Sequence, residues 1–247
     1  MSGSSSYDDV AAMYHALWVN AYLPLAMPAL ERLFFSRIVP NARVLDLCCG
    51  SGHVTATLVK RGYEVTGVDS SAALVAIAQH DLPQVEFYVQ DIRNLNIDGP
   101  FNAALSTFDS LNHILSLEDL HGVFSGVYSV LDPGGLFVFD MNLEEAYALD
   151  LHQWAVNIRH DAVGLSRGIY DAVTHTAHTE LIWFTQRGSE NCWQKSHSIV
   201  EERCYEKQDI VQALQFAGFR NVEVHHALDL NVDKELGYGR YFFSARR

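Results

Sequence analysis

The sequence predicts a doubly wound α/β fold, in which a parallel sheet carries helices on both faces. Between residues 43 and 141, short apolar runs alternate with segments of helical periodicity, and this alternation is typical of parallel strands joined by helices. A glycine-containing turn follows the first apolar run, at the position where many α/β proteins bind nucleotides. The chain has 247 residues, which fits a single domain spanning residues 1–247.

Local signals justify each element in turn. Apolar residues recur at helical spacing from Tyr7 to Phe35, so we expect a helical cap over residues 1–40. Gly62 ends the helix that follows the first strand, and Ser70 or Ser71 caps the next helix. The expected strands are residues 43–47, 64–69, 85–90, 101–107 and 136–141, and the expected helices between them are residues 53–61, 71–79 and 117–131.

The pattern changes after the fifth strand. Residues 152–205 are rich in β-forming segments separated by turn residues, and no helical periodicity intervenes, so we expect antiparallel strands inserted into the domain. Their place in the chain puts this insertion over the carboxyl edge of the sheet. A helix over residues 207–217 and strands at 222–226 and 240–245 follow, and the closeness of the last two strands predicts an antiparallel end to the sheet.

Charge and composition exclude several classes of function. The chain has 17 basic and 30 acidic residues, for a net charge of −13, and this balance disfavours a nucleic acid partner, which requires clustered cations. The first residues do not resemble a signal peptide, and the longest apolar stretch is too short to cross a bilayer. The four cysteines form no zinc or disulfide pattern. We therefore expect a cytoplasmic protein without a membrane partner.

The segment that carries chemistry is Val44–Thr55, where a strand, a turn and a helix follow one another. Gly50 and Gly52 allow the backbone of the turn to approach a ligand, and the helix start offers unpaired N–H groups. Asp69 ends the next strand, where a carboxylate accepts the ribose hydroxyls of a nucleoside. Asp91 follows the third strand, within reach of an adenine amino group.

A dinucleotide cofactor is the first alternative for this segment. Its fingerprint requires a third small residue where this chain has Thr55. Asp46, within the first strand, would repel a pyrophosphate but would suit an ammonium group. S-adenosylmethionine carries an ammonium and a sulfonium and no phosphate, so the charge pattern favours S-adenosylmethionine.

The sequence resembles the class I S-adenosylmethionine-dependent methyltransferases in four motifs, at Val44–Gly52, Val65–Ser70, Gln90–Ile92 and Leu131–Val138. The resemblance implies a seven-stranded Rossmann-like sheet of order 3-2-1-4-5-7-6 with strand 7 antiparallel, and S-adenosylhomocysteine as the product. It also implies a set of cofactor-binding residues: Tyr14, Asp46, Cys48, Gly50, Gly52, Asp69, Ser70, Asp91, Ile92, Thr107 and Phe108.

The segment Thr107–His113, after the fourth strand, resembles that of small-molecule enzymes, including amino-sugar N-methyltransferases, and lacks the proline pair of base and glutamine methyltransferases. His113 is the candidate general base, because an imidazole exchanges protons near neutral pH; a hydrogen-bonding role at a helix start is the alternative. The candidate substrate-binding residues are Asp109, Asn112, Arg159, Tyr170 and Trp183.

Other readings of this sequence remain open. Tyr14 either reaches the methionine carboxylate of the cofactor or packs against its neighbours in the helical cap. The insertion is either a lid over the substrate or a sheet that joins two copies in a homodimer. Asp109, Asp140 and Asn142 do not match the pattern of magnesium-dependent methyltransferases, so no metal is expected. Protein or RNA methylation, or nucleoside binding without catalysis, are the alternative functions.

Overall fold

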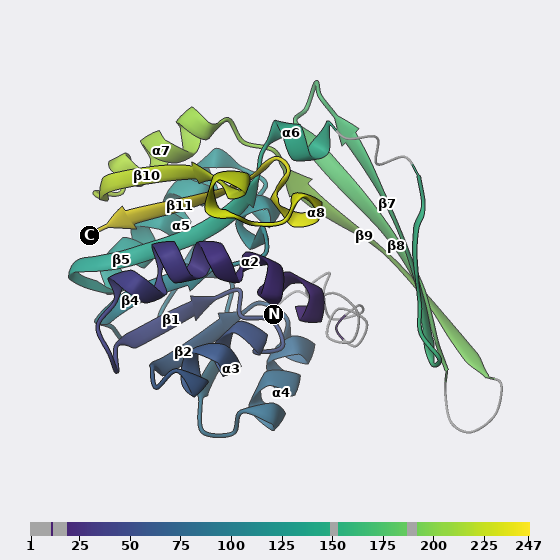
Figure 1. Cartoon of the computed structure of the whole chain (residues 1–247), viewed down its shortest axis with the longest axis horizontal. Coiled ribbons are helices and arrows are strands. Elements are labelled where there is room, and N and C mark those ends of the chain that lie inside the picture. The colour runs from purple at the N-terminus through teal and green to yellow at the C-terminus, as the bar shows by residue number, and fades with distance from the viewer. Residues whose placement is uncertain (1–10, 12–18, 149–152, 187–191) are drawn as a thin grey trace.

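The computed structural model describes residue 11 and residues 19–148, 153–186 and 192–247. Its main body is a seven-stranded sheet of order β10-β11-β5-β4-β1-β2-β3 (Figure 1). The central strands are parallel, whereas β11 is antiparallel to both β5 and β10. This arrangement confirms the predicted order 3-2-1-4-5-7-6. The strands are β1 (Arg43–Leu47), β2 (Glu64–Asp69), β3 (Glu86–Val89), β4 (Phe101–Ser106), β5 (Leu131–Asn142), β10 (Arg220–His226) and β11 (Arg240–Arg246).

Helices cover both faces of this sheet, because the side chains of each buried strand alternate between two apolar layers. Leu45 and Phe137 pack in one layer with the helices α5 (Leu117–Val130) and α7 (Lys207–Phe216). Val44 and Val138 pack in the opposite layer with α2 (Val19–Leu33) and α3 (His53–Lys60). The helix α4 (Ala72–Asp81) packs near β2 and β3. The doubly wound prediction is therefore confirmed.

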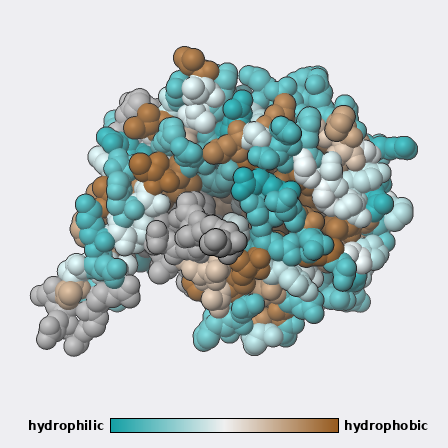
Figure 2. Space-filling model, turned by 180° about the vertical axis from the view of Figure 1, so that it is seen from behind, coloured by the Kyte–Doolittle hydropathy of each residue, from teal (hydrophilic) through white to brown (hydrophobic). Residues whose placement is uncertain are grey.

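A second sheet follows β5 in the chain. The strands β6 (Ala155–Ile158), β7 (Ala162–Asp171), β8 (Thr176–Gln186) and β9 (Trp193–Arg203) pair antiparallel in the order β6-β7-β8-β9, as predicted. We call this sheet the arm. It projects from the body as a long twisted ribbon (Figure 1). Seen from behind, the surface of the body mixes hydrophilic and hydrophobic side chains (Figure 2).

The end of the arm next to the body is its root, where Asp171 pairs with Thr176 and Thr176 pairs with Arg203. There β9 contacts η4 (Ser110–His113), the short turn of helix that follows β4. The prediction that the whole insertion lies over the carboxyl edge of the sheet is therefore corrected: the root lies at the segment after β4, and the other end of the arm extends away from the body (Figure 1).

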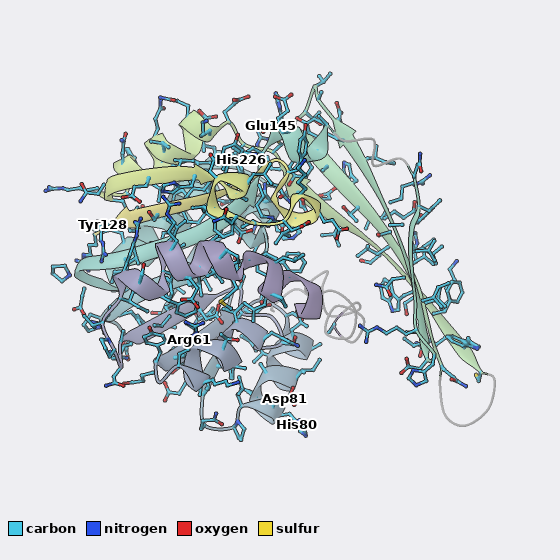
Figure 3. All side chains as sticks on the ribbon, viewed as in Figure 1. Arg61, His80, Asp81, Tyr128, Glu145 and His226 are labelled. Carbon is cyan, nitrogen blue, oxygen red and sulfur yellow. The ribbon has the colours of Figure 1, made fainter. Side chains whose placement is uncertain are left out.

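Short elements complete the body. They are η2 (Phe35–Arg37), η3 (Ile92–Asn94), η5 (Ala227–Leu230), α6 (Glu144–Tyr147) and α8 (Lys234–Gly237). Figure 3 shows Glu145 of α6 beside the root of the arm, and its carboxylate accepts a hydrogen bond of 3.0 Å from the Tyr241 hydroxyl of β11. No helix in the described part of the chain combines the length and hydrophobicity that a bilayer crossing requires.

Candidate active site

The turn after β1 has the tight backbone that its glycines predict. Cys48, Gly50 and Gly52 all have positive φ, of 55°, 53° and 83°. A side chain at Gly52 would place its Cβ 3.1 Å from the Cβ of Ala78 on α4, and its φ also favours glycine. The turn therefore packs closely against α4 and leads directly into the first residue of α3.

Asp69, at the end of β2, ties this turn to the start of α4. Its Oδ2 accepts a hydrogen bond of 2.9 Å from the Gly50 amide, and its Oδ1 accepts one of 2.8 Å from the Ser71 amide. The Ser71 hydroxyl in turn accepts the Leu74 amide and caps α4, which decides between the two predicted caps. Ser70 is exposed beside it. The Asp69 carboxylate is thus fixed in place before any ligand arrives.

Asp46 is buried in β1, and its carboxylate accepts a hydrogen bond of 2.5 Å from the Thr55 hydroxyl of α3. The pKa of the Asp46 carboxyl is raised to about 7, chiefly by burial; the Thr55 hydrogen bond opposes this rise and the nearby Asp69 carboxylate adds to it. A dinucleotide site has a small residue at the position of Thr55. In this chain the Thr55 hydroxyl instead orients the acidic side chain of Asp46 beside the pocket.

A pocket opens at the carboxyl ends of β1 and β4. Its lining combines acidic, sulfur-containing and aromatic side chains, and within the described residues it includes no lysine or arginine. Such a lining suits a ligand with an ammonium and a sulfonium better than one with phosphates, so the residues present fit S-adenosylmethionine. The lining residues are Tyr22, Asp46, Cys48, Cys49, Ser51, His53, Val54, Thr107 and Phe108.

The backbone after β4 is held in an uncommon conformation. Phe108 and Asp109 have φ angles of 63° and 49°, which non-glycine residues seldom adopt unless the surroundings enforce them. Here Asp140 of β5 enforces them, because its carboxylate accepts the Phe108 amide at 2.8 Å and the Asp109 amide at 3.2 Å. The Phe108 ring stacks on Tyr22 of α2, with 4.6 Å between centroids. The turn after β4 is thereby fixed beside the pocket.

A buried arginine neutralises the carboxylates around this turn. The guanidinium of Arg240, at the start of β11, donates to Asp140 and, at 2.8 Å, to Asp109. The Tyr22 hydroxyl also donates to Asp140, at 2.8 Å, and the Asn142 amide donates to Asp109, at 3.1 Å. Two of the three side chains considered as metal ligands, Asp109 and Asp140, thus bond a guanidinium, and the third, Asn142, bonds Asp109.

His113 ends η4 at the root of the arm. Its Nδ1 lies 2.9 Å from the Glu201 carbonyl oxygen, and its Nε2 lies 3.8 Å from a carboxylate oxygen of Glu202. The Tyr147 hydroxyl donates to the other Glu202 oxygen at 2.7 Å. The candidate base is therefore part of a cluster to which the arm contributes directly.

The remaining residues predicted to bind substrate lie at different distances from the pocket. Asn112 is fully buried, and its side-chain amide forms hydrogen bonds with the backbone of Asn142 and Arg203. The prediction that Asn112 binds substrate is therefore corrected: its side chain joins η4 to β5 and β9. Tyr170 stacks on Tyr147 at the root. Arg159 is exposed beyond β6, in the turn at the far end of the arm, away from the pocket.

Trp183 is also displaced from its predicted place at the pocket. It is buried on β8 and pairs with Gly164 and Ser196, seven residues beyond Thr176, which corresponds to about 23 Å along the strand. Trp183 therefore lies in the outer half of the arm, and its predicted contact with substrate at the carboxyl edge is corrected.

The adenine motif is in the predicted place after β3. The Asp91 carboxylate pairs with the Arg93 guanidinium, and this hydrogen-bonded partner lowers the pKa of Asp91. Ile92 beside it is buried. Tyr7, Tyr14 and Trp18 lie outside the described residues, so the choice between the two roles of Tyr14 stays a prediction.

Several functional candidates were missed by sequence reasoning. Tyr22 had a signal, because Tyr14, Trp18 and Tyr22 are aromatic residues spaced four apart, as on one face of a helix. The others had no local signal, since each acts through a partner that is distant in the chain. They are Tyr147, Glu202 and Arg240, which the fold brings to the segment after β4. Asp140 was considered only as a metal ligand, and its role in holding the turn after β4 was missed.

Comparison with known proteins identifies the family. Residues 44–135 match the model of a methyltransferase domain. A protein of Geobacillus sp. (strain WCH70) that is named as a methyltransferase is 30% identical over 212 residues, which cover 83% of this chain and 84% of that protein. The chain belongs to the methyltransferase family. Its sheet has the strand order and the antiparallel strand β11 of the class I fold.

Solved structures of methyltransferases share the whole fold. An S-adenosylmethionine-dependent methyltransferase from Clostridium acetobutylicum is similar with a TM-score of 0.79 and 22% identity, covering 98% of this chain and 99% of that one. The S-adenosylmethionine-bound amino pentose methyltransferase CalS10 from Micromonospora echinaspora is similar with a TM-score of 0.74 and 21% identity, covering 95% and 96%. The coverage includes the arm in both cases.

Replacing Asp69 with alanine is expected to weaken cofactor binding by this methyltransferase. A charged acceptor for the ribose hydroxyls would be lost, at a cost of about 1.5–3 kcal/mol, or roughly tenfold to a hundredfold in affinity. Calorimetry with S-adenosylhomocysteine measures the change, and Asp81→Ala, an exposed substitution at the far end of α4, is the control. Unchanged affinity in the Asp69 variant would contradict the ribose assignment.

Cofactor affinity is also expected to depend on pH through Asp46. Before the cofactor binds, the Asp46 carboxyl has a pKa of about 7, and an ammonium group favours its ionised form. Binding below pH 7 must therefore release a proton, so the affinity for S-adenosylhomocysteine should fall about tenfold from pH 8 to pH 6. Calorimetry across this range checks the slope, which Asp46→Asn should abolish; the same slope in both proteins would assign it to another group.

Proposed function

We propose that this enzyme transfers the methyl group of S-adenosylmethionine to an amine nitrogen or a hydroxyl oxygen of a small organic molecule. The observation that carries the proposal is the junction between η4 and the root of the arm. The Asn112 amide bonds the Arg203 carbonyl at 2.8 Å, and the Tyr205 hydroxyl bonds the Ile114 carbonyl. An element after β4 and an inserted sheet thus join beside the pocket, which favours a small acceptor over an extended polymer.

The charge of this junction supports the same class of substrate. Asp109, Asp140 and Glu202 lie near the segment after β4, where Arg240 pairs with the first two. The whole chain has 30 acidic and 17 basic residues. An RNA backbone would meet net repulsion here, because its binding depends on clustered cations.

The structural likeness to the Micromonospora enzyme supports a small acceptor as well. That protein is an amino pentose methyltransferase, and the likeness extends over 95% of this chain. The arm is therefore part of what the two proteins share. We take the amino sugar as an example of the acceptor class, since the fold alone does not assign a substrate.

In this mechanism the protein aligns the reactants and manages a proton. S-adenosylmethionine supplies an electrophilic methyl group when bound. Asp46 and Asp69 would hold the charged and ribose ends of the cofactor, and the fixed turn at Phe108 and Asp109 would form one side of the site. His113 accepts the proton that the acceptor loses. Alignment and exclusion of water account for most of the rate enhancement in such a displacement.

The test is a measurement of S-adenosylhomocysteine formation by the full chain with panels of small amines, small alcohols, RNA and unfolded proteins. We expect turnover with members of the small-molecule panels and a background rate with the polymers. Turnover with RNA or protein alone would overturn the proposal. Binding of S-adenosylhomocysteine without turnover of any panel member would also count against it, in favour of nucleoside binding without catalysis.

A further inference from the structure

The strand register of the arm gathers its large apolar side chains on one face. Directly paired residues of an antiparallel sheet point to the same side, and so do residues two apart along a strand. Ile158 pairs with Val163, and Val163 pairs with Phe184, so these three side chains form one row across the sheet. We call this side the apolar face of the arm, and its large apolar residues are Val156, Ile158, Val163, Leu165, Ile169, Ile182, Phe184, Trp193 and Ile199.

Large apolar side chains are more exposed on the apolar face than on the opposite face of the arm. Ile158 is 72% exposed, Val156 is 56% exposed and Ile199 is 54% exposed. On the opposite face, Leu181 and Trp183 are buried. Single exposed apolar residues are common on soluble proteins, but a contiguous apolar patch marks a surface that binds a partner.

The arm lacks a second layer on this face. An apolar face of a sheet is stable in water when another layer of structure packs on it. The arm is a single sheet that projects away from the body (Figure 1), and side chains stand out on both sides of its ribbon (Figure 3). Val156 and Ile158 belong to its outer half, next to the turn at Arg159. Because these side chains are exposed in the single chain, a second layer has to come from another molecule.

The charges of the apolar face favour a second copy of this chain as that molecule. The strands place three basic and three acidic side chains on this face: Arg167, Lys195, Arg203, Asp171, Glu180 and Glu201. The formal charge of the face is therefore zero, whereas the whole chain has a net charge of −13. Two such faces can meet without the repulsion that the rest of the two chains would cause. An anionic lipid surface would repel the acidic chain and would gain no net cation from this face.

The size of the face also suits a dimer. The strands β7, β8 and β9 have 10, 11 and 11 residues. At about 3.3 Å per residue and about 4.8 Å between strands, these three strands alone present about 500 Å² on each face. Two copies would therefore bury about 1,000 Å² before β6 and the relief of the side chains are added, which reaches the roughly 1,000 Å² that a specific interface requires.

We propose that the apolar face of the arm is the interface through which two copies of this chain form a homodimer. The interface is isologous, since each copy contributes the same face and a two-fold axis relates them. Val156 and Ile158, which are exposed in the single chain, become buried against the other copy. Of the two roles considered for the insertion, the apolar face thus serves the joining of two copies. The cofactor pocket lies in the body and takes no part in this contact.

The test is the oligomeric state of the full chain, measured by sedimentation velocity at micromolar concentrations. We expect a species with twice the mass of the chain. The double substitution Val156→Lys with Ile158→Lys should raise the dissociation constant of the dimer by at least about a hundredfold, because both copies would have to bury ammonium groups without partners. Affinity for S-adenosylhomocysteine should stay at the wild-type value, which reports that the body is folded. Should this variant not fold, Ile199→Lys places one charge on the same face from β9 and should also dissociate the dimer.

The matched control is Ala155→Lys with Asn157→Lys, which adds the same charge to the same strand at exposed positions on the opposite face. It should remain dimeric. A wild-type chain that is monomeric throughout would overturn the inference, and so would equal dissociation of both double variants or of neither. Vesicles of phosphatidylcholine and phosphatidylglycerol test the other occupant: a monomeric chain that sediments with them, and no longer does so with Val156→Lys and Ile158→Lys, would assign the face to lipid instead.

Discussion

Replacing Arg240 with methionine is expected to destabilise the fold by about 3–5 kcal/mol, because it leaves two carboxylates without their cation. Arg240 is 4% exposed, Asp140 is 1% exposed, and both Asp109 and Asp140 bond to the guanidinium. Methionine fills much of the same volume, so the loss arises chiefly from charge. For a chain of this length the corresponding fall in melting temperature is roughly 10 °C.

Thermal and urea unfolding measure this effect. Arg220→Met, at an exposed position at the start of β10, is the control and should stay within about 0.5 kcal/mol of wild type. Adding Asp109→Asn to the Arg240 variant should recover part of the loss, because it removes one of the unpaired charges. An Arg240 variant as stable as the control would mean that the carboxylates are neutral in the native protein.

The elements of the body were predictable because their signals are local. Alternating apolar residues mark both faces of each strand, and β1 and β2 begin and end at the predicted residues. The cofactor side of the site was also predictable to a large extent. Gly52 lies in one continuous strand–turn–helix segment, and Asp69 ends the next strand. Because these two strands are parallel neighbours, the fold places both residues at the same edge of the sheet.

The acceptor side was less predictable, for a physical reason. Whether a residue of the insertion reaches the sheet depends on the direction in which the arm projects, and strand alternation does not encode that direction. Arg159 and Trp183 were therefore predicted to bind substrate, whereas the arm places both of them far from the pocket. Glu202 was overlooked although the root brings it to His113. Buried polar groups such as Asn112 show the same limit, since their partners belong to distant strands.

Thr55 bears on the choice of cofactor in two ways. Thr55 counted only as a departure from the dinucleotide pattern. In the structure its hydroxyl bonds the Asp46 carboxylate at 2.5 Å, so the residue that disfavours one cofactor also shapes the site for the other. Asp46 and Thr55 thus determine both the charge and the packing at this end of the pocket.

Replacing His113 with alanine is expected to lower kcat/KM for an amine acceptor by about 10²–10⁴, the range typical of a lost general base. The geometry supports this expectation, because Nδ1 is held by the Glu201 carbonyl and Nε2 faces Glu202. Affinity for S-adenosylhomocysteine should be unchanged, since His113 does not line the cofactor pocket.

Steady-state kinetics across pH, together with calorimetry, test this prediction. His121→Ala is the matched control, because His121 lies on α5, stacked on Phe216 and not in the cluster around Glu202. Supplying the variant with a weakly basic amine, which is already neutral at the assay pH, should restore much of the rate, since no proton then has to be removed before methyl transfer. Near-wild-type turnover with a strongly basic amine would instead show that alignment alone suffices, and it would retire His113 as the base while leaving the methyltransferase itself in place.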